Sequence, residues 1–233
     1  MGLKKHCQFF CWLTLACALA GLRAETSPVA QSGLEALVAR DDNAGFAFPK
    51  LIKAISGYHV IPWDGEQAAA LQRAAEATLL SAQERPVKSG RVNEVGLAVE
   101  KRLQAALEAE GFVVDIPRTQ SGRRQSAGYP DLVARKDGEI FYVEVKCFSK
   151  KTENSTQRSF YLSATDDPKV REAAIHLLFG FQVSEFAEDC YRIDSFEVLD
   201  LAGLVCELKL EFNASNRDLY NGDLTILKSS DDS

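Results

Sequence analysis

Apolar and polar positions recur with two different periods along the chain. The helical period is clearest over residues 92–110, where apolar side chains return every three or four positions and Gly111 follows as a stop signal. Shorter helical patterns cover residues 34–38 and 67–82. These segments predict helices that bury one face.

Short apolar runs bounded by turn residues predict strands. Residues 131–135 and 140–148 flank a Lys-Asp-Gly turn and predict a β-hairpin. The remaining predictions are strands at 112–116, 196–200 and 205–212, a helix at 166–179, linkers or loops at 45–65 and 83–90, and a mobile loop at 119–129. This mixture predicts an α/β fold with a mixed central β-sheet and helices on both sides.

The 233 residues divide into four parts by composition. Residues 1–24 have the pattern of a removable signal, and residues 25–88 are predicted to form an N-terminal helical extension. Residues 89–228 are predicted to form the main domain, followed by a tail at 229–233. About 210 residues remain for folding, which suits one medium domain.

The front of the chain combines Lys4 and Lys5 with an apolar run at residues 9–20 and small residues after it. The run has 12 residues, whereas a membrane-spanning helix needs about 20. We therefore expect a cleaved signal, export to the periplasm or medium, and no membrane span in the mature chain. The alternative is a start further along the chain and a cytoplasmic protein, although Met1 is the sole methionine.

The charge balance limits how the protein could bind nucleic acid. The chain has 27 basic and 33 acidic residues, a net charge of −6. This excludes a protein that coats nucleic acid through overall positive charge. Residues 118–158, however, hold nine basic and five acidic residues, a local net of +4. Any nucleic-acid contact is expected in this part, although a solvated surface is the alternative.

Three of the six cysteines lie in the front segment, which leaves Cys147, Cys190 and Cys206. Their odd number and wide spacing support neither a disulfide framework nor a zinc site. A bridge between Cys190 and Cys206 after export stays open, as do three unpaired thiols.

The chemistry of the chain is concentrated in the predicted hairpin. Side chains alternate along a strand, so Glu144 and Lys146 share one face. Asp131 begins the neighbouring strand and can approach the same face. Two carboxylates and an ammonium group at one point suit phosphodiester hydrolysis, because hard oxygen ligands hold Mg²⁺ while both cations stabilise negative charge at phosphorus. The alternative is a solvent-facing charge pair.

Pro130, Asp131, Glu144 and Lys146 together resemble the motif of the PD-(D/E)xK nuclease superfamily. The flanking runs 91–96, 176–181 and 212–220 resemble a group of type II restriction endonucleases, so the likeness covers roughly residues 89–222. It implies a restriction endonuclease-like fold, Mg²⁺ with Mn²⁺ as a substitute, double-stranded DNA as substrate and a homodimer that cuts both strands.

The superfamily often adds an acidic residue from the helix before the motif. Glu100 is the first choice for this third metal-associated carboxylate, and Glu94, on another face of the same predicted helix, is the alternative. A solvated helix charge is the competing interpretation of both. His176 is predicted to be a packing histidine and not a catalytic base.

Two further groups of residues are candidates for DNA contacts. Arg123 and Arg124 lie in the predicted loop before Asp131, and Asn213, Ser215, Asn216 and Arg217 follow a predicted strand. Amides can bind base edges and arginines can bind phosphates. A solvated loop and a polar turn are the competing interpretations.

The sequence thus predicts a Mg²⁺-dependent DNA endonuclease in which Asp131, Glu144 and Glu100 serve the metal and Lys146 the attacking water. One alternative is an exported nuclease without sequence specificity. Another is a non-catalytic module on the same fold that binds nucleic acid or protein.

Overall fold

The computed structural model of the chain describes residues 45–90, 92–151 and 160–207. The helices are α2 (Phe48–Ser56), α3 (Ala68–Glu84), α4 (Val92–Ala109) and the short 3-10 helix η1 (Leu201–Gly203). The strands are β1 (Phe46–Ala47), β2 (Val87–Lys88), β3 (Val113–Asp115), β4 (Leu132–Lys136), β5 (Glu139–Phe148), β6 (Ile175–Ala187), β7 (Cys190–Asp200) and β8 (Val205–Cys206).

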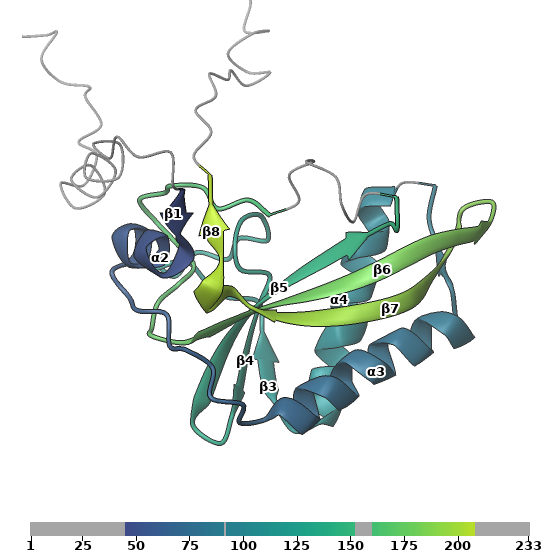
Figure 1. Ribbon diagram of the computed structural model, residues 1–233, viewed down its shortest axis with the longest axis horizontal. Coiled ribbons are helices and arrows are strands. Elements are labelled where there is room, and N and C mark those ends of the chain that lie inside the picture. Colours follow the sequence, from purple (N-terminus) through teal and green to yellow (C-terminus); the bar gives the residue numbers. More distant parts are fainter. Residues whose placement is uncertain (1–44, 91, 152–159, 208–233) are drawn as a thin grey trace, which may run out of the picture.

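Six strands form one sheet in the order β2-β7-β6-β5-β4-β3, and β1 pairs with β8 in a second, two-stranded sheet. Strands β5 and β6 run parallel, while the other neighbours in the large sheet are antiparallel. Strand β5 therefore lies inside the sheet, between β4 and β6. The mixed central sheet that the sequence predicts is confirmed (Figure 1).

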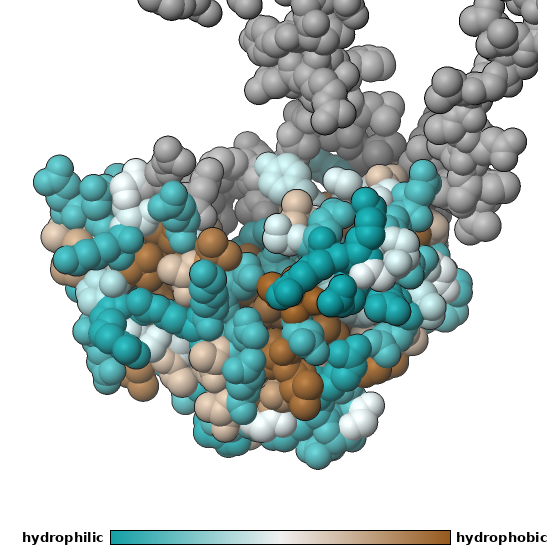
Figure 2. All heavy atoms as spheres, turned by 180° about the vertical axis from the view of Figure 1, so that it is seen from behind, coloured by the Kyte–Doolittle hydropathy of each residue, from teal (hydrophilic) through white to brown (hydrophobic). Residues whose placement is uncertain are grey.

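Helices cover both faces of this sheet, as predicted. Helices α3 and α4 pack together on one face, and α2 lies against the other near β1 and β8 (Figure 1). The segment predicted as a helical extension thus supplies helix α3 to one face and helix α2 to the opposite one. The view from behind shows a mainly hydrophilic surface with apolar side chains gathered towards its middle (Figure 2).

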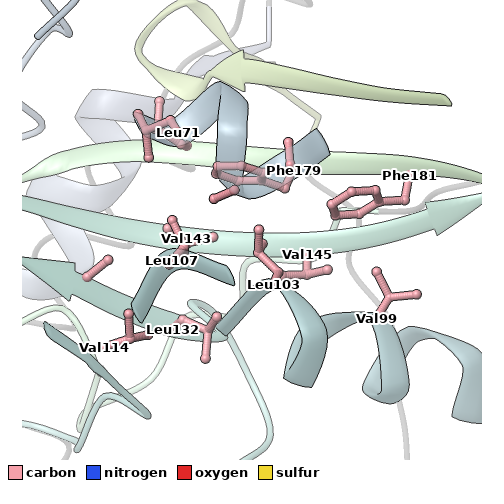
Figure 3. Close-up of a cluster of buried hydrophobic side chains, with 14 of the residues drawn as sticks. Leu71, Val99, Leu103, Leu107, Val114, Leu132, Val143, Val145, Phe179 and Phe181 are labelled. Atoms are coloured by element: carbon pink, nitrogen blue, oxygen red, sulfur yellow. The ribbon is translucent and has the colours of Figure 1, made fainter. Parts of the chain in front are cut away.

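The larger core lies between the sheet and helices α3 and α4. Leu103 and Leu107 of α4 are fully buried and meet Val143 of β5 and Phe179 of β6 (Figure 3). Because side chains alternate along a strand, Tyr142 of β5 and His176 of β6 point to the opposite face of the sheet. There they pack with Phe48 of α2 in a second core. Strand β5 is consequently buried on both faces, which makes any charge on it costly.

The predicted helix at 166–179 is wrong. Residues from Ile175 onward form strand β6, which pairs in parallel with β5 through the register Phe141↔Ile175. Its long apolar run is typical of a strand that is buried on both faces, and periodicity alone cannot separate such a run from a buried helix. These residues form a strand because they pair with β5, and no local sequence pattern encodes that pairing.

Helix α2 occupies a stretch that the sequence predicted to be irregular. Pro49 lies in its first turn, and Gly57 ends it with φ 81°, a left-handed conformation that glycine adopts without strain. Phe48 and Ile52, four residues apart, are both buried. This arrangement of proline, spaced apolar residues and glycine is the signal from which α2 could have been predicted.

Smaller differences concern strand bounds. The predicted linker at 83–90 contains β2, which pairs with β7, and β7 begins six residues before the predicted strand at 196–200. Strand β8 covers Val205–Cys206, and the rest of the strand predicted at 205–212 lies mostly outside the described residues, as do the predicted helix at 34–38 and residues 1–24.

The cysteines Cys147, Cys190 and Cys206 are all free in the structure, so the Cys190–Cys206 bridge is not formed. Of the helices in the described ranges, none combines the length and the apolar character needed to cross a membrane.

Candidate active site

The β4–β5 hairpin brings Asp131, Glu144 and Lys146 together. Leu132, the first residue of β4, pairs with Val143, so Asp131 lies directly before β4, level with the middle of β5. The Asp131 carboxylate accepts a hydrogen bond from the Val145 N–H at 2.8 Å, which satisfies a backbone donor beyond the end of β4. Lys146 Nζ lies 2.6 Å from Glu144 Oε1. The predicted convergence of two carboxylates and an ammonium group is present.

Glu144 is a buried carboxylate with spare binding capacity. It is 4% exposed, and its Oε2 has no hydrogen-bond partner among the described residues. Burial, followed by the nearby Asp131, raises the pKa of Glu144 to about 7, although Lys146 acts in the opposite direction. A buried oxygen without a partner is costly unless a cation or a donor binds there.

Of the two helix candidates, Glu100 reaches the electrostatic field of this cluster. The pKa of Glu100 is raised mainly by burial and next by Asp131, while Lys169, Lys101 and Lys146 lower it. Glu94 is exposed and accepts a hydrogen bond from Ser89 Oγ at 2.8 Å. The structure therefore places Glu100 within the electrostatic field of Asp131, whereas Glu94 pairs with Ser89.

A second lysine, which sequence reasoning missed, lies beside the carboxylates. Lys169 is 3% exposed, and its Nζ donates to the backbone carbonyls of Ser126, Gly128 and Pro130. Its segment was predicted to be part of a helix at 166–179, and nothing in the sequence pointed to the contacts of Lys169 with the chain before Asp131.

The donor set fits a hard divalent cation such as Mg²⁺. Within the described residues no group of three or more His, Cys, Asp or Glu side chains is close enough to hold a metal ion. Mg²⁺ does not need such a cage, because one or two carboxylates with water and substrate phosphate commonly complete its shell. Asp131 and the unpartnered Oε2 of Glu144 supply carboxylates of this kind.

His176 lies beneath this site, on strand β6. It is fully buried, and its Nδ1 is 2.6 Å from the Tyr129 hydroxyl. Burial lowers the pKa of His176 to about 3, so the ring is neutral at physiological pH. Its ring packs against Phe48, Tyr129 and Tyr142, as predicted for a packing histidine. It packs from a strand and not from a helix, and its buried Nε2 has no hydrogen-bond partner among the described residues.

Comparison with known proteins shows which protein family the chain resembles in sequence. Residues 39–223 match the type II restriction enzyme MjaV family. The chain belongs to this family. It is 34% identical over 202 residues to the type II restriction enzyme MjaV of Methanocaldococcus jannaschii, an alignment that covers 77% of this chain and 87% of that protein. No solved structure matches the chain.

Family membership makes the chain a restriction endonuclease-like protein, which confirms the resemblance drawn from the hairpin motif and its flanks. The matched range includes all of the described residues and therefore the whole β4–β5 hairpin.

In this restriction endonuclease-like chain, the loop before Asp131 is held in place. The sequence predicted a mobile loop at 119–129. Asp167 accepts hydrogen bonds from the N–H and Oγ of Ser121 and from Nε of Arg123, at 2.8, 2.6 and 3.0 Å. Gln120 donates its backbone N–H to the Pro168 carbonyl at 2.9 Å. Arg123 is thus engaged within the protein.

Arg124, by contrast, lines a hollow of about 500 Å³ next to the site. Val133 and Tyr142 form part of its wall and belong to the same sheet face as Glu144. The charged side chains that line it are Arg118, Arg124, Arg135, Lys169, Arg171, Asp115 and Glu172. Cations outnumber carboxylates here, so the hollow suits an anion.

The remaining DNA-contact candidates, Asn213, Ser215, Asn216 and Arg217, lie outside the described residues.

Proposed function

We propose that the chain is a Mg²⁺-dependent endonuclease that hydrolyses phosphodiester bonds in double-stranded DNA. The observation that carries the proposal is the buried, unpartnered Oε2 of Glu144 beside Asp131 and Lys146. A bound cation would satisfy this oxygen, and a lysine beside a metal is suited to a phosphoryl centre. Membership of a type II restriction enzyme family supports DNA as the substrate.

Each of the four proposed site residues has a defined role in the reaction. Asp131 and Glu144 would hold Mg²⁺, with Glu100 supporting the shell. When bound, the metal would supply Lewis acidity and a more acidic water. Lys146, whose side chain is 28% exposed, orients the attacking water and stabilises charge that develops on the phosphate. Burial of Glu144 keeps bulk water away from the metal-facing oxygen.

DNA is proposed to lie across the basic hollow that Arg124 lines. A local excess of cations can bind phosphates even though the whole chain is acidic. Arg123 would have to exchange its ion pair with Asp167, 2.9 Å away, for a phosphate. Asn213, Ser215, Asn216 and Arg217 are proposed to add phosphate or base contacts.

Cleavage of supercoiled plasmid DNA tests the proposal. With Mg²⁺, and with Mn²⁺ as a substitute, the wild type should nick and linearise the plasmid, while Asp131→Asn, Glu144→Gln and Lys146→Met should lose at least about 100-fold in rate. Glu139→Gln, at the other end of β5, is the matched control. An inert wild type would overturn the proposal and favour a module that only binds.

The helix carboxylates allow a second matched comparison. Glu100→Gln should slow cleavage about tenfold or more, because outer-shell partners of a metal typically contribute that much. Glu94→Gln, on the same helix but directed towards Ser89, should cut like the wild type. Equal rates for both variants would remove Glu100 from the site.

The products separate two kinds of nuclease. Discrete bands indicate the sequence specificity that the family name implies, whereas a smear indicates a non-specific nuclease. A homodimer is proposed because both strands are to be cut, and sedimentation of the protein with and without DNA measures it.

Export is proposed for the signal-like residues 1–24. The mass of the protein recovered from its own cells distinguishes a chain shortened by about 24 residues at the front from a full-length chain or one that starts further in.

A further inference from the structure

Lys169 is a buried lysine, outside the proposed catalytic set, whose hydrogen-bond donors are all engaged. Its ammonium group donates to the carbonyls of Ser126, Gly128 and Pro130 at 3.1, 2.6 and 3.0 Å. An ammonium group has three donors, so this side chain has none left. All three acceptors belong to the segment that leads into Asp131.

This saturation separates Lys169 from Lys146. Lys146 is partly exposed and pairs with one carboxylate oxygen, so it can turn towards a substrate. Lys169 is buried and has no free donor for a phosphate or a water. Lys169 is therefore not expected to contact the reacting atoms.

The position of the three carbonyls shows what Lys169 holds. Pro130 immediately precedes Asp131, whose own N–H donates to the Val143 carbonyl at 3.1 Å and whose carboxylate accepts from Val145 at 2.8 Å. Lys169 fixes the chain on one side of Asp131, and strand β5 fixes it on the other. Asp131 lies before the first residue of β4, so the strand ladder alone does not hold its approach.

We infer that Lys169 is a positioning residue of the nuclease site, which clamps residues 126–130 and thereby sets the Asp131 carboxylate beside Glu144 for metal binding. The inference rests on the proposed function, because it assigns Asp131 to the metal.

Charge supports the same role. Burial lowers the pKa of Lys169, while Asp131, Glu144 and Glu100 raise it, in that order. The ammonium group is thus within the field of all three carboxylates and offsets part of their mutual repulsion while no metal is bound.

Two effects of removing Lys169 have opposite signs, and this makes the inference testable. Loss of a positive charge near the carboxylates strengthens binding of a divalent cation. Release of residues 126–130 weakens it, because supporting partners of a metal site typically contribute 10- to 100-fold in affinity or activity. A positioning role requires the second effect to prevail.

The experiment compares Lys169→Met and Lys169→Gln with Lys136→Met. Lys136 on β4 also donates to a backbone carbonyl, that of Glu110 at 2.8 Å, but it lies at the far end of the hairpin from Asp131. Calorimetric titration with Mn²⁺ should show at least about tenfold weaker binding for Lys169→Met. Lys169→Gln, which keeps amide donors without the charge, should recover part of the affinity, and Lys136→Met should match the wild type.

DNA cleavage gives an independent measure. The turnover rate of Lys169→Met should fall about 100-fold, since a misplacement of about 1 Å can cost that much, while KM for DNA changes little. Urea unfolding establishes that the variants fold. Tighter Mn²⁺ binding in Lys169→Met, unchanged turnover, or failure of both variants to fold would each overturn the inference.

Failure of the proposed function has a different signature. If the wild type binds Mn²⁺ but does not cut DNA, the nuclease proposal fails. The Mn²⁺ affinities of the variants then remain as the test of whether Lys169 positions Asp131. If the wild type cuts DNA and Lys169→Met cuts equally well, the nuclease proposal stands and the clamp does not.

Discussion

At the scale of single residues, Glu144 shows how a function can oppose stability. Its pKa of about 7 means that burial and Asp131 together outweigh the ion pair with Lys146. The ionised form of Glu144 therefore weakens the metal-free fold at alkaline pH.

Replacement of Glu144 should accordingly stabilise the protein while it removes activity. Glu144→Gln is expected to raise the free energy of unfolding at pH 8 by roughly 1–3 kcal/mol in the absence of metal. Urea unfolding with a chelator measures it, and Glu197→Gln, at an exposed position on β7, serves as the control. Lower stability of Glu144→Gln would show that the ion pair prevails over burial.

His176 gives the fold a defined response to acid. Burial lowers the pKa of His176 from an ordinary value of about 6.5 to about 3. Between these values the unfolded chain binds a proton that the folded chain does not, so stability is lost as the pH falls through this window.

The expected loss attributable to His176 is about 1 kcal/mol per pH unit below pH 6.5. His176→Asn should flatten this part of the dependence in urea unfolding at pH 7, 6 and 5, whereas His59→Asn, at an exposed position, should not. Parallel curves for the wild type and His176→Asn would refute the assignment.

At the scale of elements, helix α4 presents one face to the core and another to solvent. Leu103 is fully buried against the sheet (Figure 3), while Leu97 on the same helix is 52% exposed. Leu103→Ala should lower the free energy of unfolding by about 2–5 kcal/mol, because it leaves a cavity. Leu97→Ala should change it by less than about 0.5 kcal/mol.

Urea unfolding of both leucine variants measures this difference. Cleavage by folded Leu103→Ala should also fall, since α4 carries Glu100. Equal stabilities would contradict the packing of α4.

At the scale of the whole molecule, charge is separated, with a basic hollow in an acidic protein. Binding of DNA through this hollow should weaken steeply with salt, and each phosphate contact adds about 0.9 to the slope of log K against log salt. Arg124→Gln should therefore reduce the slope by about one. Arg192→Gln, which removes an arginine paired with Asp194 on β7, should leave it unchanged.

Fluorescence anisotropy with a DNA duplex and the inactive Asp131→Asn protein measures these slopes. Arg123→Gln should have a smaller effect than Arg124→Gln, because Arg123 already binds Asp167. A slope that is the same in Arg124→Gln and the wild type would place the DNA elsewhere.

Much of this architecture is encoded locally. The spacing of apolar residues predicted α3, α4 and the β4–β5 hairpin, because a helix face and a tight turn are short-range features. Strand alternation likewise predicted that Glu144 and Lys146 share a face. These local signals were sufficient to predict the α/β fold and the convergence of Asp131, Glu144 and Lys146.

Other features arise only when distant segments meet. Strand β6 became a strand through pairing with β5, against a local pattern that favoured a helix. Lys169 joined the site because this pairing brings the segment before β6 alongside the loop that precedes Asp131. Burial of Glu144 likewise depends on distant segments that cover its face of the sheet. Desolvation and long-range pairing are properties of the folded molecule, and no window of sequence contains them.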